Sequence, residues 1–410
     1  MIDFEIPEKI AGIRNVVETV AVNMMRPVSR YFDEHEHEIP WDYINFMHTA
    51  TRAMGGSSMA ASEGKKEGPR FGFQRLAVMV EVLSWGDAGI YLDTPGGMLG
   101  SAAVSATGTP EQKERFLARF RGEKPTFDAM CMTEPQCGSD TAAIRTTAVL
   151  DKEKNEWVLN GEKIFVTAGH KAMLDSEGFI VVWATIDPSA GRAGMRPFVV
   201  EAGTPGCQVT NMEHKLGIRA SDTVTIVLQD CRIPFENILG SPEVITDKAS
   251  TSFKGAMATF DATRPIVAAQ AIGLARATLE LLKEMLAERG VTIRYGLPRQ
   301  KLTSIEKDVI DMEVMLRSAW WLVLKAVWMM DNGKPNALES SMSKVRAGDV
   351  VNRITQKAVE IMGPLGYNRE HLLEKWFRDA KISDIYEGTG QINRLVVARQ
   401  LLGYRSSELR

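Results

Sequence analysis

The sequence has few cysteines, little excess charge and no recognisable targeting segment. Its 410 residues include four cysteines without a C-x-x-C pair, so we predict neither a disulfide framework nor a metal site. The net charge of −3 gives no indication of nucleic-acid binding. The first ten residues are acidic and lack an apolar core, and no apolar run approaches the length of a membrane span. We therefore expect a cytoplasmic protein without a signal peptide or membrane span.

The spacing of apolar residues divides the chain into three parts. Residues 1–128 show helical spacing, whereas residues 129–240 contain β-branched and apolar runs separated by glycine and proline. Helical spacing returns in residues 241–410. This order predicts an α+β protein with a helical domain, an antiparallel β domain and a second helical domain. The long helices expected in the last part are 312–330, 347–362 and 391–402.

Local motifs predict particular turns and helix ends. Within residues 156–167, Asn160-Gly161 is typical of a hairpin turn between two strands. Residues 261–265 (DATRP) are typical of a helix start, with capping side chains and a proline in the first turn. Thr109, followed by proline, is an expected helix N-cap.

Two further stretches allow a structural and a functional interpretation. Residues 33–38 (DEHEHE) look like a metal-ligand cluster, but no other histidine or cysteine stands nearby at metal-site spacing. A solvated loop or helix face is the favoured interpretation. The small residues between Gly96 and Ala106 fit either close helix packing or the wall of a roomy pocket.

Glu387 is the most unusual acid in the sequence. It lies between an aromatic residue and a Gly-Thr turn, near the end of the chain. Gly388 allows close approach of a backbone or ligand, and Thr389 and Gln391 add hydrogen-bonding groups. One interpretation is a general base in a buried slot, where loss of water raises its proton affinity. The other is a helix–helix corner with a solvated glutamate.

A second stretch, residues 130–140 (MCMTEPQCGSD), favours the first interpretation. Together with residues 378–391, it resembles the acyl-CoA dehydrogenase family from about Gly108 to the C-terminus. The resemblance implies an N-terminal helical domain, a middle antiparallel β domain and a C-terminal four-helix-bundle domain. It also implies FAD between the middle and C-terminal domains, an acyl-CoA substrate, an electron-transfer flavoprotein as partner, and a tetramer.

The resemblance further implies which residues form the site. Glu387 takes the α-proton of a thioester while a β-hydride passes to the flavin, which gives a trans-2-enoyl-CoA, as in fatty acid β-oxidation. The flavin ribityl hydroxyl and the Glu387 N–H bind the thioester oxygen. The implied FAD contacts are Met130, Met132, Thr133, Gly138, Ser139, Phe165, Thr167, Arg294, Glu360, Gly363, Thr389 and Gln391. The implied substrate contacts are Ser139, Asp261, Thr263, Arg264, Tyr386 and Gly388.

Four positions depart from the family pattern, all in the part of the FAD site that a partner subunit completes. Arg294 is shifted in spacing, Thr303 replaces a glutamine, Glu360 replaces a neutral residue, and residues 363–366 alter a glycine turn. Both a homotetramer and a heterotetramer with a related chain are compatible with this pattern. The alternative functions are an acyl-CoA oxidase, or a subunit with an incomplete FAD site that supports a catalytic partner. The sequence does not distinguish between fatty acyl, branched acyl and steroid side-chain groups as the acyl part of the substrate.

Overall fold

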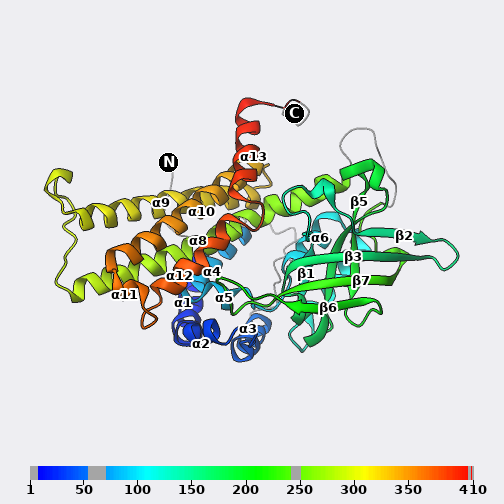
Figure 1. Ribbon diagram of the computed structural model, residues 1–410, viewed down its shortest axis with the longest axis horizontal. Coiled ribbons are helices and arrows are strands. Elements are labelled where there is room, and N and C mark those ends of the chain that lie inside the picture. Colours follow the sequence, from blue (N-terminus) through cyan, green and yellow to red (C-terminus); the bar gives the residue numbers. More distant parts are fainter. Residues whose placement is uncertain (1–7, 54–70, 242–250, 405–407, 409–410) are drawn as a thin grey trace.

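The computed structural model describes residues 8–53, 71–241, 251–404 and 408. Helices come first, then a β-sheet, then helices again, as the apolar spacing predicts (Figure 1). The expected loop at residues 61–70 lies outside the described residues. The helices before the sheet are α1 (Glu8–Val20), α2 (Ser29–Glu34), α3 (Trp41–Ala53), α4 (Gly72–Gly86), α5 (Ala88–Tyr91), α6 (Leu99–Thr107) and α7 (Pro110–Leu117).

The N-terminal helices show the capping that the sequence predicts. Thr109 caps α7, since its hydroxyl accepts from the Gln112 N–H while the Gln112 side chain accepts from the Thr109 N–H. The small residues of α6 serve close packing, because a Cβ at Gly100 would lie 2.8 Å from the Ala129 carbonyl oxygen. The buried Asp128 carboxylate also accepts from the Met98 and Gly100 N–H groups, which fixes α6 against the sheet.

The middle of the chain forms a seven-stranded sheet in the order β1-β4-β2-β3-β7-β6, with β5 paired to β4. Four pairings are antiparallel, as predicted, but β4 runs parallel to both β1 and β2, so the sheet is mixed. Residues of β4 are buried throughout, in keeping with its central place. The strands are β1 (Asp128–Cys131), β2 (Thr147–Asp151), β3 (Glu156–Thr167), β4 (Phe179–Thr185), β5 (Met195–Glu201), β6 (Cys207–Met212) and β7 (Thr223–Pro234).

The predicted hairpin at Asn160-Gly161 is wrong, because β3 runs through both residues. The pairing of β3 with β7 shifts register between Leu159 and Gly161, so the glycine marks a bulge. Its φ is +154°, and a Cβ there would overlap Thr146 of the neighbouring chain segment. The glycine is therefore needed for close approach of another segment and makes no turn.

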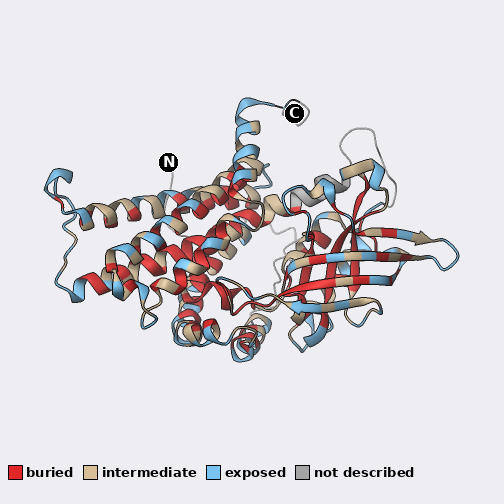
Figure 2. Cartoon of the chain, in the orientation of Figure 1, coloured by how far each residue is buried: buried red, intermediate tan, exposed pale blue. Residues whose placement is uncertain are grey.

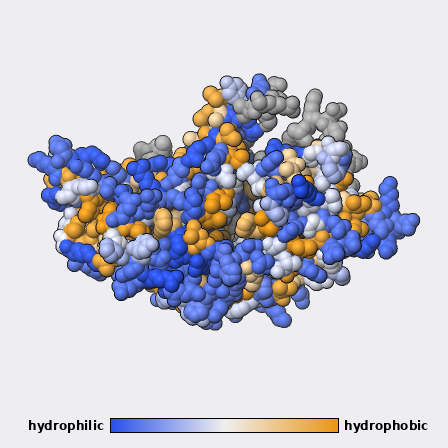
Figure 3. All heavy atoms as spheres, viewed as in Figure 1, coloured by the Kyte–Doolittle hydropathy of each residue, from blue (hydrophilic) through white to orange (hydrophobic). Residues whose placement is uncertain are grey.

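The helices after the sheet are α8 (Thr251–Glu288), α9 (Ser304–Asp331), α10 (Ala337–Met362), α11 (Pro364–Tyr367), α12 (Leu373–Ala380) and α13 (Gly390–Leu402). The long helices α8, α9 and α10 lie side by side, α4 packs against α8 and α9, and the facing sides of these helices are buried (Figure 2). The helix α13 contacts α10 and projects from the body (Figure 1). Figure 3 shows apolar side chains over this projection, where Leu395, Leu401 and Leu402 are exposed.

The predicted helix start at residues 261–265 is also wrong, because α8 begins at Thr251 and contains Pro265. A proline inside a helix leaves the carbonyl four residues earlier without its donor. That carbonyl belongs to Asp261, and it accepts hydrogen bonds from Asn336 Nδ2 at 3.2 Å and Ser340 Oγ at 2.9 Å. Two side chains of the α9–α10 region thus replace the missing N–H and keep the helix continuous.

One stretch of α8 corrects the prediction that no apolar run approaches membrane length. By length and composition, Thr259–Glu288 is apolar enough to cross a membrane, and among the described residues it is the one such helix. However, 78% of its most apolar window is buried inside the protein. The neighbouring helices cover it (Figure 2), so its apolar character is that of the central helix of a bundle.

Candidate active site

Glu387 lies in the connection between the short 3₁₀ segment Lys381–Asp384 and α13. Its φ is +58° and that of Gly388 is +87°, so two consecutive residues adopt left-handed conformations. A non-glycine residue held there is strained, and such strain is concentrated at functional sites. Thr389 then caps α13 by accepting from the Ile392 N–H. The backbone therefore presents the Glu387 side chain at a fixed place, before the first turn of α13.

The carboxylate of Glu387 faces α8. Thr263 Oγ1 donates to Glu387 Oε2 at 2.7 Å, and Arg264 Nε donates to the Glu387 carbonyl at 3.3 Å. Burial raises the pKa of Glu387, while the Thr263 hydrogen bond and the charges of Arg264 and Lys344 oppose that rise. The net pKa lies above the ordinary glutamate value. A partly buried carboxyl group with a raised pKa suits a general base.

Lys344 of α10 places a second positive charge near this carboxylate. The side chain is 2% exposed, and its Nζ has no hydrogen-bond partner among the described residues. Burial lowers the pKa of Lys344 to about 8, although Asp384 and Glu387 favour its charged form. An unpartnered buried ammonium is costly, so such groups are rare outside functional sites.

Two more polar contacts surround Glu387. The Tyr386 hydroxyl donates to Gln270 Oε1 at 2.7 Å, which ties the residue before Glu387 to α8. Arg264 Nη1 lies 3.0 Å from Asp261 Oδ1 and 3.4 Å from Ser341 Oγ. The Arg264 guanidinium is thus held by one acid and one hydroxyl while it contacts the Glu387 carbonyl.

In the middle domain, the two segments of the predicted cofactor site lie side by side. The Ile164 N–H donates to the Thr133 carbonyl at 3.0 Å, which connects β3 to the residues after β1. Lys163 Nζ donates to Glu134 Oε1 at 2.7 Å and to the Met132 carbonyl at 3.2 Å. Both side chains of this ion pair are almost fully buried. The pair therefore fixes the backbone on either side of Thr133.

Phe165 stands next to this contact and has two unusual features. Its φ is +56°, and its side chain is 61% exposed although the flanking Ile164 and Val166 are not exposed. Ala168, just after Thr167, also has a positive φ of +61°. A strained backbone that presents an aromatic ring to the surface provides a flat apolar face for a bound ring.

Phe260 lies between the middle-domain segments and the surroundings of Glu387. It packs against a buried cluster that includes Met132, Cys137, Trp183 and Met195 of the middle domain. The guanidinium of Arg264, one turn further along α8, lies 5.7 Å from the Phe260 ring centroid. The residues around Thr133 and the carboxylate of Glu387 therefore meet on the same stretch of α8.

Comparison with known proteins shows the family of the chain. Models of the N-terminal, middle and C-terminal domains of acyl-CoA dehydrogenases match residues 7–123, 129–231 and 253–402, respectively. The NADH-dependent acryloyl-CoA reductase of Anaerotignum propionicum is 35% identical over 98% of this chain and 96% of its own length. The chain belongs to the acyl-CoA dehydrogenase family.

Other members of the family are equally similar over the whole length. The mitochondrial short-chain specific acyl-CoA dehydrogenase of Rattus norvegicus is 34% identical over 98% of this chain and 92% of its own length. The structure of butyryl-CoA dehydrogenase from Megasphaera elsdenii superposes with a TM-score of 0.83 at 31% identity, covering 98% of this chain and all of that one. The chain is thus an oxidoreductase of the acyl-CoA dehydrogenase family, and it has the family's three-part fold.

Three residues that the acyl-CoA dehydrogenase resemblance assigns to FAD lie away from Glu387. Arg294 lies in the connection between α8 and α9, where Nε and Nη2 bind the Glu306 carboxylate at 2.6 and 2.7 Å. Glu360 is exposed and paired with Lys357 at 2.6 Å. Gly363, with φ +56°, ends α10. Since each helical residue rises about 1.5 Å, Gly363 lies about 28 Å along α10 from Lys344.

The remaining assigned residues are spread around the two segments already described. Gly138 and Ser139 are exposed beyond β1, and a Cβ at Gly138 would meet only Thr133, at 4.0 Å. Gln391 is exposed in the first turn of α13. The structure therefore brings Thr263, Arg264 and Gly388 to Glu387, and places Thr133 beside the Phe165 segment.

Sequence reasoning missed Lys344, Ser341 and Gln270, which support the site from α8 and α10. Each lies in a helix, where a lone polar residue looks like part of a solvated face. Their burial depends on which helices pack together, and α10 packs closely here because a Cβ at Gly348 would lie 2.9 Å from the Ser383 carbonyl oxygen. No local motif marks such residues.

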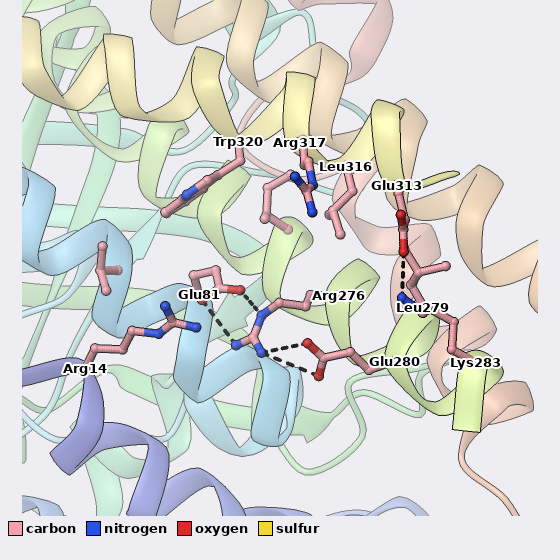
Figure 4. A pocket seen from close by; sticks show the side chains of 12 residues that line it. Arg14, Glu81, Arg276, Leu279, Glu280, Lys283, Glu313, Leu316, Arg317 and Trp320 are labelled. Atoms are coloured by element: carbon pink, nitrogen blue, oxygen red, sulfur yellow. Dashed lines mark hydrogen bonds and ion pairs between the residues drawn. The ribbon is translucent and has the colours of Figure 1, made fainter. Parts of the chain in front are cut away.

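The structure also contains a cavity of about 310 Å³ elsewhere in the helical part (Figure 4). It lies between α1, α4, α8 and α9 and contains none of the predicted site residues. Most of its charged side chains are paired: Arg276 with Glu81 and Glu280, and Lys283 with Glu313. These pairs make it a charged crevice of the helix bundle, separate from the Glu387 site.

Proposed function

We propose that this protein is a flavin-dependent acyl-CoA dehydrogenase that converts an acyl-CoA thioester to a trans-2-enoyl-CoA. Glu387 is the general base that removes the α-proton. The observation that carries this proposal is the strained, partly buried Glu387, whose carboxylate Thr263 holds at 2.7 Å. The family of the chain supports the reaction class.

The surroundings of Glu387 suit the removal of a weakly acidic proton. A base must be ionised before it acts, and the Thr263 hydroxyl with the nearby Arg264 and Lys344 charges keeps the carboxylate available despite its burial. Burial also limits water around the carboxylate, which strengthens its interaction with a bound substrate. The Glu387 N–H is the proposed donor to the thioester oxygen, where negative charge develops as the proton leaves.

The residues around Thr133 and Phe165 fit a flavin. The exposed Phe165 ring, on a strained strand end, offers a face for stacking. The open space around Gly138 leaves room for a ring, and the Thr133 and Thr167 hydroxyls can form hydrogen bonds with it. We propose that these residues, with Met130, Met132, Ser139, Thr389 and Gln391, hold FAD. When bound, FAD supplies the two-electron acceptor for the β-hydrogen.

We propose that the substrate contacts come from Ser139, Asp261, Thr263, Arg264, Tyr386 and Gly388. The Thr263 and Arg264 side chains are 3% exposed and bond Glu387, so they act chiefly by holding the base. Asp261 and Gly388 are partly exposed beside them and are open to a bound thioester. We further propose an electron-transfer flavoprotein as acceptor and a cytoplasmic location, both on the family resemblance.

The experiment is an anaerobic titration of the purified yellow protein with acyl-CoAs, followed by the bleaching of the flavin absorbance. The panel runs from propionyl- and butyryl-CoA to long-chain, branched and cyclic acyl-CoAs. We expect one class to bleach the wild type and the control Glu370→Gln, an exposed acid of the same domain, but not Glu387→Gln. If bleaching survives in Glu387→Gln at the wild-type rate, the base is another residue.

Arg294, Glu360 and Gly363 are proposed to meet the FAD of a neighbouring subunit in a tetramer. The Glu306 carboxylate already occupies the Arg294 guanidinium, which favours a heterotetramer with a related chain. Glu360 is exposed and paired with Lys357, so its charge does not exclude a nearby diphosphate and is compatible with both assemblies. Native mass spectrometry of the protein purified from its own cells distinguishes them: one chain mass supports the homotetramer, and two related masses support the heterotetramer.

A further inference from the structure

Two histidines and a glutamate from separate segments meet where the N-terminal helices contact the middle domain. Glu36 and His37 follow α2, and His214 follows β6. His214 Nδ1 lies 3.0 Å from Glu36 Oε2, and the centroids of the two imidazole rings are 4.6 Å apart. One possible ligand atom from each of the three residues lies within 4.8 Å of the other two. His214, far along the chain, thus adds a third possible ligand to two residues of the histidine-rich stretch 33–38.

His37 adds an independent sign of an incomplete site. Its Nε2 is buried and has no hydrogen-bond partner among the described residues. A buried polar atom without a partner costs free energy, so such atoms are rare and call for an explanation. An ion bound through Nε2 would supply the missing bond.

We propose that Glu36, His37 and His214 bind one divalent transition-metal ion of the zinc type. Two imidazole nitrogens and one carboxylate oxygen form a ligand set that zinc, nickel and cobalt accept. Zinc bonds of about 2.0–2.2 Å place tetrahedral ligand atoms roughly 3.4 Å apart. The three groups must therefore approach one another by at most about 1.4 Å, and the His214 side chain, 84% exposed, has room to turn.

The surroundings orient the ligands but also limit the affinity. Glu36 Oε1 accepts from the Lys215 N–H at 2.7 Å, which leaves Oε2 facing His214. Such outer contacts fix the orientation of metal-binding carboxylates. The Lys215 ammonium turns away and donates to the Ser221 carbonyl at 2.6 Å. The positive charges of Lys215 and Arg219 act on Glu36 and oppose a cation, so we expect weaker binding than in a closed structural zinc site.

An ion here would tie the turn after α2 to the loop between β6 and β7. That loop also contacts the C-terminal domain, since the Ile218 N–H donates to Asp379 Oδ1 at 2.5 Å. The ion would therefore stabilise a junction of all three parts of the chain. Because it binds only the folded state, it would raise the midpoint of thermal unfolding by about 3 °C at a concentration about 100 times its Kd.

The test is a calorimetric titration of the tag-free, chelator-treated full chain with ZnCl₂ and, separately, with CoCl₂. We expect one ion per chain, an affinity at least tenfold lower in His37→Ala and His214→Ala, and a four- or five-coordinate absorption spectrum for bound cobalt. The matched control is His35→Ala, which removes the neighbouring histidine. His35 stacks on Tyr31 at a centroid distance of 4.0 Å and lies outside the cluster.

Two results would overturn the proposal: no saturable binding by the wild type, or equal binding by the wild type and His214→Ala. The exposed His214 can be replaced without loss of core packing, so the test does not depend on a variant that fails to fold. The readout is metal binding by the chain itself, so it is independent of the dehydrogenase proposal.

Discussion

Thr263→Val tests how the fold controls the proposed base. The substitution keeps the shape of a side chain that is 3% exposed and removes the hydroxyl that donates to Glu387 Oε2 at 2.7 Å. A hydrogen bond to a charged group contributes about 1.5–3 kcal/mol. Because this hydrogen bond favours the charged form, its loss raises the pKa of Glu387 further.

The sign of the effect follows from the chemistry of a base. Burial already raises the pKa of Glu387, and the Thr263 hydrogen bond acts against that rise. Without it, the carboxyl group stays protonated to a higher pH and is inactive as a base. We therefore expect the acidic limb of kcat/KM against pH to move to higher pH, with most activity recovered at high pH.

The assay is the pH dependence of kcat/KM with the preferred acyl-CoA and an artificial electron acceptor. Thr278→Val is the matched control, since Thr278 is also a buried threonine of α8 but donates to the Leu274 carbonyl. It should leave the acidic limb in place. An unchanged limb in folded, flavin-bound Thr263→Val would refute the idea that this hydroxyl stabilises the charged base.

Three further predictions concern buried charges and packing. Lys344→Met removes a positive charge, so it should also raise the pKa of Glu387 and move the acidic limb of kcat/KM to higher pH. Lys344→Arg keeps the charge, so its acidic limb should lie at the wild-type pH. Gly273→Ala should destabilise the protein by about 1–3 kcal/mol in urea unfolding, because its Cβ would overlap a carbonyl oxygen of α4. Lys163→Met should cost about 3–5 kcal/mol at neutral pH, because it leaves the Glu134 carboxylate buried and unpaired. Burial raises the pKa of Glu134, but the charge of Lys163 and the hydrogen bonds from Lys163, Thr146 and Arg145 outweigh it and lower that pKa to about 2. The ionised carboxylate therefore stabilises the wild type at neutral pH, and this stabilisation should be lost as the pH falls from about 4.5 towards 2. Lys163→Met should lose less stability over the same pH range.

Local sequence patterns correctly predicted those features of the fold that depend on neighbouring residues alone. The helix cap at Thr109 and the helical, β and helical order follow from side chains that act on their own backbone or on one face of an element. The predictions at Pro265 and Gly161 are wrong because the roles of these two residues depend on distant partners. Asn336 and Ser340 supply hydrogen bonds around the proline, and the close approach of Thr146 requires the glycine.

The sequence by itself determined the family and predicted Glu387 as the central acid of the proposed site. Glu387 with Gly388 and the stretch at residues 130–140 are continuous motifs, because the tight turn and the strand end need particular neighbouring residues. Only the tertiary structure decided which charges surround them. Lys344 reaches the base because α10 packs against the Ser383 turn, and His214 reaches His37 because the β6–β7 loop contacts the turn after α2. Such contacts depend on the packing of whole elements, which leaves no periodic or local pattern in the sequence.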